Sequence, residues 1–178
     1  MSVGAAKSGT EINARAVLKA AGLSYKDLSK VEYLDFGASV DLMKNRQLDA
    51  TLISAGLGVS AIRDLATSVP IVLIPVPADT VAKIGDPAYQ STVIPAHTYE
   101  GQNADVPAVS IQNYLVTSSD LKPDLVYAMT KAIFDNLPTL VAAHSAAKAI
   151  TLENAPKPGP VPLHEGAERF YKEKGVLK

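Results

Sequence analysis

The chain has 178 residues, of which 47% are hydrophobic and 20% charged, and its formal net charge is −1 at pH 7. This composition is typical of a folded globular protein. The near-neutral charge gives no basic field for nucleic acid, so we expect no nucleic-acid binding. The chain has no cysteine, which excludes disulfides, thiolate metal ligands and cysteine nucleophiles. No run approaches 18 uninterrupted apolar residues, so we expect no direct membrane insertion, and the N-terminus lacks the pattern of a signal peptide.

The first half of the chain alternates apolar stretches with helical patterns. We expect helices at 11–21, 39–45 and 60–67 and strands at 2–5, 31–36, 48–56 and 69–76. Strands separated by helices are typical of a parallel sheet with helices on both faces. The fold class that we predict is therefore α/β.

The second half has a different pattern. Residues 75–107 are rich in Pro and Gly and predict a loop with short strand pieces, followed by a strand at 109–117. Apolar spacing predicts an amphipathic helix at 123–137. Further helices are expected at 140–149 and 166–174, with a Pro-rich surface segment at 155–162 between them.

The turn at 6–9 precedes the first predicted helix and is the strongest candidate site. A Walker loop is excluded, because Lys7 precedes Gly9 rather than following it. A catalytic Lys7–Ser8 pair is disfavoured, since adjacent side chains rarely point at each other. The open alternatives are that Ser8, Gly9 and Thr10 bind an anion at the helix N-terminus, or that the hydroxyls only cap the helix.

Two further segments are candidates for the same site. Ser54, Ala55 and Gly56 follow an apolar stretch and precede a helix, so in a parallel sheet they would lie at the same edge as the first turn. Tyr99 lies in a long polar loop, where it either contacts a ligand or packs beneath the loop. We expect no metal site and no cofactor, since the three histidines are scattered and no G-x-G-x-x-G occurs.

Several long blocks, in order, resemble the TAXI-type solute receptors of TRAP transporters. They are VGAAKSGTEINARAVLKAAGL, YLDFGASVDLMKNRQLDATLISAGLGVSAIRDLA, IPAHTYEGQNADVPAVSIQNYLVTSSDL and the segments around LVYAMTKAIFDNL and VPLHEGAERFYKEKG. The resemblance implies a type II periplasmic-binding-protein fold. It implies a periplasmic receptor, not an enzyme, that captures a small carboxylate such as an acidic amino acid and delivers it to a TRAP permease.

By this resemblance, residues 1–92 correspond to the second α/β lobe. Residues 93–178 correspond to a crossover loop, a returning strand and C-terminal helices that would pack on a first lobe, which the chain is expected to lack. Ser8, Gly9 and Thr10 match the Gly-Ser-Gly-Thr loop of that family, whereas Lys7 stands where many members have glycine. Tyr99 matches a recurrent Thr-Tyr. The alternative function is the effector-binding domain of a transcription regulator, and an acyl-transfer enzyme using Ser8 is a weaker rival.

Overall fold

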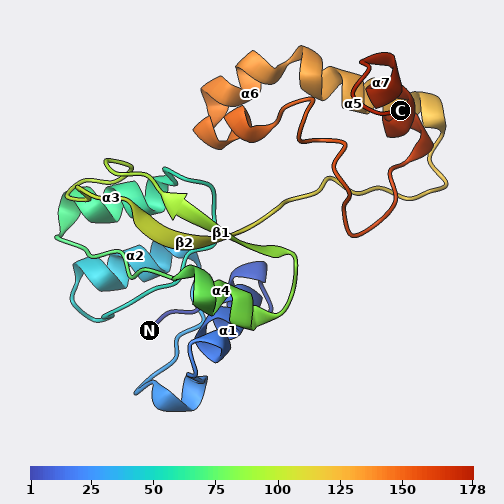
Figure 1. The fold of residues 1–178 in the computed structure, drawn as a ribbon. Helices are drawn as coiled ribbons and strands as arrows, with labels where there is room; N and C mark the ends of the chain where they lie inside the picture. Colours follow the sequence, from blue (N-terminus) through green and yellow to red (C-terminus); the bar gives the residue numbers. More distant parts are fainter. The chain divides into compact units, whose positions relative to one another are not determined.

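The computed structural model describes all residues, 1–178, and the chain divides into two compact units, Met1–Gln112 and Asn113–Lys178. The elements of the first unit are α1 (Gly9–Ala20), η1 (Tyr25–Asp27), α2 (Phe36–Lys44), α3 (Ser60–Ser68), α4 (Ala78–Ile84), β1 (Tyr89–Ile94) and β2 (Val106–Ile111). Those of the second are α5 (Pro123–Asp135), α6 (Leu137–Ala143), η2 (Ser145–Ala149) and α7 (Glu165–Glu173), as Figure 1 shows. The chain is thus a mixed α/β protein, and none of its helices combines the length and apolar character needed to cross a membrane.

Parallel pairing in the first unit is limited to isolated bridges. Ser2 bridges Glu32 on one side and Thr51 on the other, both in parallel orientation. The backbone bonds include Ser2 N–H to the Ala50 carbonyl at 2.9 Å and Val3 N–H to the Glu32 carbonyl at 3.0 Å. The segments predicted as strands at 2–5, 31–36 and 48–56 therefore lie side by side, but they are too briefly paired to form a continuous parallel sheet.

The strand predicted at 69–76 does not form. This segment contains Pro70 and Pro75, neither of which has an N–H group for a strand ladder. Val72 and Ile74 are 88% and 76% exposed. The continuous apolar run of this segment therefore does not correspond to a buried strand of a central sheet.

The one continuous sheet is the antiparallel pair β1–β2, in which Tyr89 lies opposite Ile111 and Ile94 opposite Val106. A strand was predicted at 109–117, but β2 ends at Ile111 because β1 begins at Tyr89 and offers no further partner. This pairing also extends the first compact unit through Gln112, beyond the boundary at residue 92 expected from the sequence.

The core of the first unit is formed by Val3 and by buried side chains of α1, α2 and α3. Its buried side chains include Val3, Ala14, Val40 and Leu65. A buried hydrogen bond joins the hydroxyls of Ser2 and Ser39 at 2.8 Å. Ser39 itself donates to the Asp35 carbonyl at 2.7 Å. Its single hydrogen is then used, so Ser2 is the donor of the pair, and the two serines tie the first segment of the chain to the start of α2.

The second unit is built on the packing of α5 against α7. Phe170 is fully buried and stacks on Phe134, with ring centroids 5.3 Å apart. At Gly166, an added Cβ would lie 2.2 Å from the Pro123 carbonyl oxygen, so only glycine permits this close approach of the two helices. The helices predicted at 123–137 and 166–174 are confirmed to within two residues at each end, whereas the one predicted at 140–149 is divided at His144 into α6 and η2.

Candidate functional site

The turn at residues 6–9 forms the capped N-terminus of α1. Lys7 adopts a left-handed conformation with φ 61°, and the Ser8 N–H donates to the Ala5 carbonyl at 3.0 Å. Ser8 is the N-cap, as one of the alternatives from the sequence predicted, and its hydroxyl accepts from the Glu11 N–H at 3.2 Å. The N–H groups of Gly9 and Thr10 have no acceptor in the chain, so this helix end retains two unsatisfied donors.

Thr10 is closely packed beside this turn. It is 8% exposed, and its methyl group lies so close to Gly4 that a Cβ on that glycine would be 2.6 Å away. Gly4 has φ +91°, so glycine is required there on both conformational and steric grounds. The Thr10 hydroxyl has no hydrogen-bond partner within the chain and is open to solvent, since the buried side-chain oxygen without a partner is that of Thr51.

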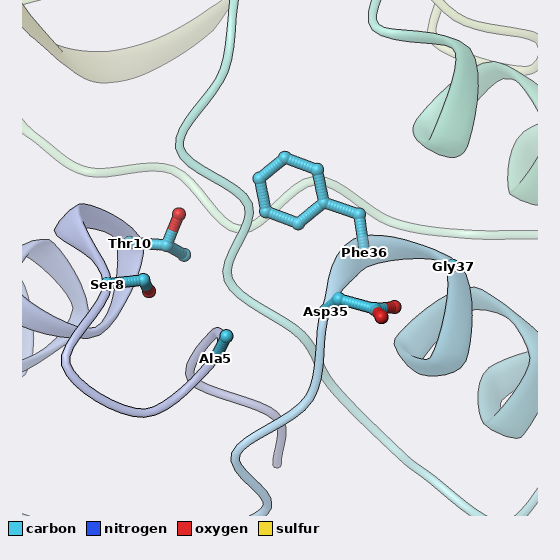
Figure 2. A pocket seen from close by; sticks show the side chains of 6 residues that line it. All are labelled: Ala5, Ser8, Thr10, Asp35, Phe36 and Gly37. Carbon is cyan, nitrogen blue, oxygen red and sulfur yellow. The ribbon is translucent and has the colours of Figure 1, made fainter.

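Ser8 and Thr10 line an open cavity of about 460 Å³ together with four residues that the sequence did not single out. The full lining is Ala5, Ser8, Thr10, Asp35, Phe36 and Gly37. Figure 2 shows the Thr10 side chain leaving α1 on the side that faces the Phe36 ring. The N-termini of α1 and α2 therefore meet at one cavity, and the end of α1, whose cap is the neutral Ser8 hydroxyl, is favourable for a small anion.

The cavity residues Asp35 to Gly37 had a signal in the sequence. Asp is among the preferred N-cap residues, and "DFGAS" precedes an apolar helical run. In the structure the Asp35 carboxylate caps α2 by accepting from the Ala38 N–H at 2.8 Å. Reading this segment as a second helix start, rather than as the end of a strand, would have identified Asp35 as an N-cap, although not its position at the cavity.

The carboxylate of Glu11, near the start of α1, is paired with a cation outside the cavity. Glu11 is buried and forms an ion pair with Arg15, and the Tyr25 hydroxyl donates to its carboxylate at 3.0 Å. The hydrogen bond from Arg15 is the main cause that lowers the pKa of Glu11. Burial, and next the hydrogen bond between Tyr25 and Glu11, raises the pKa of Tyr25 to about 12. Glu11 is thus a paired structural carboxylate and not part of the cavity lining.

The second predicted turn, at 54–56, lies beside α1 but outside the cavity. The Asn13 side-chain amide donates to the Ser54 hydroxyl at 2.9 Å, and Asn13 in turn accepts from the Tyr89 hydroxyl at 3.0 Å. Ser54, Ala55 and Gly56 are exposed. Lys7 and Gly9 are also exposed, and neither contributes to the cavity lining.

Tyr99 lies at a different cavity. Its side chain is 6% exposed, and its hydroxyl accepts from the Gly58 N–H at 3.2 Å. The second cavity, of about 360 Å³, is lined by Arg63, Thr67, His97, Thr98, Tyr99, Glu100, Gly101 and Asn103. The structure therefore brings together Ser8 and Thr10, places Ser54 next to α1, and separates Tyr99 from the cavity at the two helix ends.

The hydrogen-bond donors at the first cavity are backbone N–H groups and hydroxyls, which can bind an anionic group. No three His, Asp or Glu side chains are grouped so as to hold a metal ion.

A comparison with protein-family models gives a match to the NMT1-like family over residues 1–175. This is a family of binding proteins that resemble periplasmic binding proteins, and it indicates a general solute-binding function. Because the match covers nearly the whole chain, the protein belongs to the NMT1-like family.

Proposed function

We propose that this protein is the solute-binding subunit of a TRAP-type transport system, of the TAXI class, acting in the periplasm. It captures a small organic carboxylate without changing it chemically and passes it to the membrane permease. Membership of a binding-protein family supports the receptor function. The resemblance of the long sequence blocks described above supports the transporter class.

The observation that carries this proposal is the pair of unsatisfied N–H groups at Gly9 and Thr10, next to the unpartnered Thr10 hydroxyl. A carboxylate has two acceptor oxygens that can satisfy these donors, and the positive end of the helix dipole favours its negative charge. The neighbouring cavity of about 460 Å³ has room for the body of a small solute.

The remaining predicted residues take supporting roles in this proposal. Lys7, exposed at the turn, adds positive charge that attracts the ligand, while Ser54, Ala55 and Gly56 widen the binding surface beside α1. Tyr99 shapes the loop that leads out of the lobe. Residues 1–92 act as one α/β lobe and residues 93–178 as segments returning to the other. Closure of the two lobes follows from tighter ligand binding in the closed state.

The proposal is tested by titrating the ¹⁵N-labelled chain with acetate and pentanoate at millimolar concentration, where weak binding is detectable. We expect saturable shifts of the Gly9 and Thr10 amide signals. Thr10→Val removes the hydroxyl at almost constant shape, and we expect it to weaken binding about tenfold, because one charge-assisted hydrogen bond is lost.

Thr10→Ser is the matched control, since it keeps the hydroxyl and should retain most of the affinity. Unfolding measurements on both variants separate a loss of binding from a loss of folding. If no carboxylate moves the Gly9 and Thr10 signals, or if Thr10→Val binds as well as the unmodified chain, the proposed capture at α1 is wrong.

A further inference from the structure

We propose that the cavity at the two helix ends selects monocarboxylates with an apolar body and rejects dicarboxylates, and that Asp35 is the residue that sets this preference. The inference rests on the proposed carboxylate-binding function and specifies the class of solute that the site accepts. It makes Asp35 a specificity-determining residue that acts through its charge, and it excludes the acidic amino acids that the resemblance implies, because these carry two carboxylates.

The two helix ends at the cavity differ in charge. The cap of α1 is the neutral Ser8 hydroxyl, so the positive end of its dipole remains available to a ligand. The cap of α2 is the Asp35 carboxylate, whose negative charge compensates the positive end of that helix. In Figure 2 this carboxylate is directed towards Gly37, away from Ser8 and Thr10. One negative charge is therefore favoured at α1, and a second one near α2 is opposed.

Thr10 is an independent indication of a ligand. Its hydroxyl lacks a hydrogen-bond partner although the residue is more than nine-tenths buried, and the residue lines the cavity. The Thr10 oxygen is not among the side-chain atoms closed off from solvent without a partner, so the hydroxyl is open to the cavity and available to an acceptor group of a ligand.

The rest of the lining provides no counter-ion for a second carboxylate. Asp35 is its only charged side chain, and Phe36 and Ala5 are apolar. The nearest cation on α1 outside the turn, Arg15, is already paired with Glu11, and Lys7 does not line the cavity. The ring of Phe36, which faces Thr10, instead offers an apolar wall to a hydrocarbon body.

The test compares pentanoate with pentanedioate, which have the same carbon chain but differ by one carboxylate. Both are titrated into the ¹⁵N-labelled full chain at neutral pH, and the Gly9 and Thr10 amide signals are followed. We expect pentanedioate to bind at least about tenfold more weakly, because its second carboxylate is repelled by the Asp35 carboxylate at the cavity and finds no cation there.

Asp35→Asn removes the charge and keeps a good N-cap, so α2 should remain folded. We expect this variant to bind pentanedioate about tenfold more tightly than the unmodified chain does, with pentanoate changed by less than about threefold. Asp41→Asn is the matched control, since Asp41 is exposed on the same helix and does not line the cavity. It should leave both affinities unchanged.

The outcomes separate the two hypotheses. Equal binding of the two acids to the unmodified chain, or an unchanged preference in Asp35→Asn, overturns the role of Asp35 and leaves carboxylate capture at α1 standing. An equal effect of Asp41→Asn also overturns it, because the preference would then reflect overall charge. Failure of both acids to move the Gly9 and Thr10 signals overturns the proposed function and this inference together.

Discussion

At the scale of single residues, Lys7 is the most testable position of the candidate site. Its φ of 61° lies in the left-handed region, which costs a non-glycine residue about 1–2 kcal/mol. Lys7→Gly removes this strain, while the greater freedom of glycine in the unfolded chain offsets about 0.5–1 kcal/mol of the gain. We expect a net increase of about 0.5–1 kcal/mol in the free energy of unfolding, measured by urea denaturation.

Lys19→Gly is the control for this change. Lys19 is exposed in the last turn of α1, where glycine should lower the free energy of unfolding by about 1 kcal/mol. A loss of stability in Lys7→Gly comparable with that in Lys19→Gly would mean that Lys7 does not hold the left-handed conformation, or that its side chain makes a stabilising contact.

The sequence identified one half of the cavity and missed the other for a physical reason. Ser8 was recognisable because hydroxyl residues before a helical run are typical N-caps, and the structure gives it that role. Asp35 and Phe36 were assigned to a strand, since "VEYLDF" has the apolar content of one. Only the fold brings the start of α2 to the start of α1, and no local pattern in the sequence encodes that meeting.

At the scale of elements, the contact of α5 with α7 depends on Gly166. An added Cβ would lie 2.2 Å from the Pro123 carbonyl oxygen and 2.7 Å from the Tyr127 nitrogen, both backbone atoms that cannot rotate away. Gly166→Ala should therefore separate the two helices and lower the free energy of unfolding by about 1–3 kcal/mol. Amide hydrogen–deuterium exchange in α5 and α7 should be faster in this variant than in the unmodified chain.

Gly9→Ala provides the contrast. No atom lies within 4 Å of a Cβ built at Gly9, which begins α1, so alanine there should be neutral or stabilise by up to about 1 kcal/mol. If Gly166→Ala had the same free energy of unfolding as Gly9→Ala, the conclusion that α5 and α7 pack too closely for a Cβ at residue 166 would be wrong.

The prediction of helices succeeded where that of strands partly failed. An amphipathic helix such as α5 satisfies its own backbone hydrogen bonds and carries its apolar spacing in consecutive residues. A strand needs a partner from elsewhere in the chain. Residues 69–76 have apolar content suited to a strand, but their prolines and the exposure of Val72 and Ile74 show that pairing does not follow from composition. Conversely, β1 lies in a Pro- and Gly-rich region where only short strand pieces were expected.

At the scale of the whole molecule, the boundary between the compact units is a different division of the chain from the lobe boundary that the resemblance implies. The resemblance to the receptor family implies that the second lobe ends at residue 92, where the crossover loop begins. The structure places the change after Gln112, since β2 returns along β1 and binds the intervening loop into the first unit. A loop closed by paired strands belongs to the unit of those strands, and this cannot be read from loop composition alone.

Limited proteolysis tests this boundary. Residues 112–120 are all exposed and lie outside helices and strands, and Tyr114 and Leu115 are 44% and 76% exposed. Chymotrypsin, which prefers aromatic residues and leucine, should therefore cut first at these two residues, because exposed segments without regular structure are cleaved most readily. Mass spectrometry should show an N-terminal fragment ending at one of them, and the double substitution Tyr114→Asn with Leu115→Asn should slow this cut.

A first cut near residue 92 would instead support the boundary expected from the sequence. It would also mean that β1 and β2 separate readily, because the protease needs an extended chain of several residues in its own active site. Pairing of Tyr89 with Ile111 and of Ile94 with Val106 holds that region in a hairpin, whereas no backbone N–H group of residues 115–119 donates to another backbone carbonyl. The order of cleavage therefore measures where backbone hydrogen bonding, rather than composition, ends the first unit.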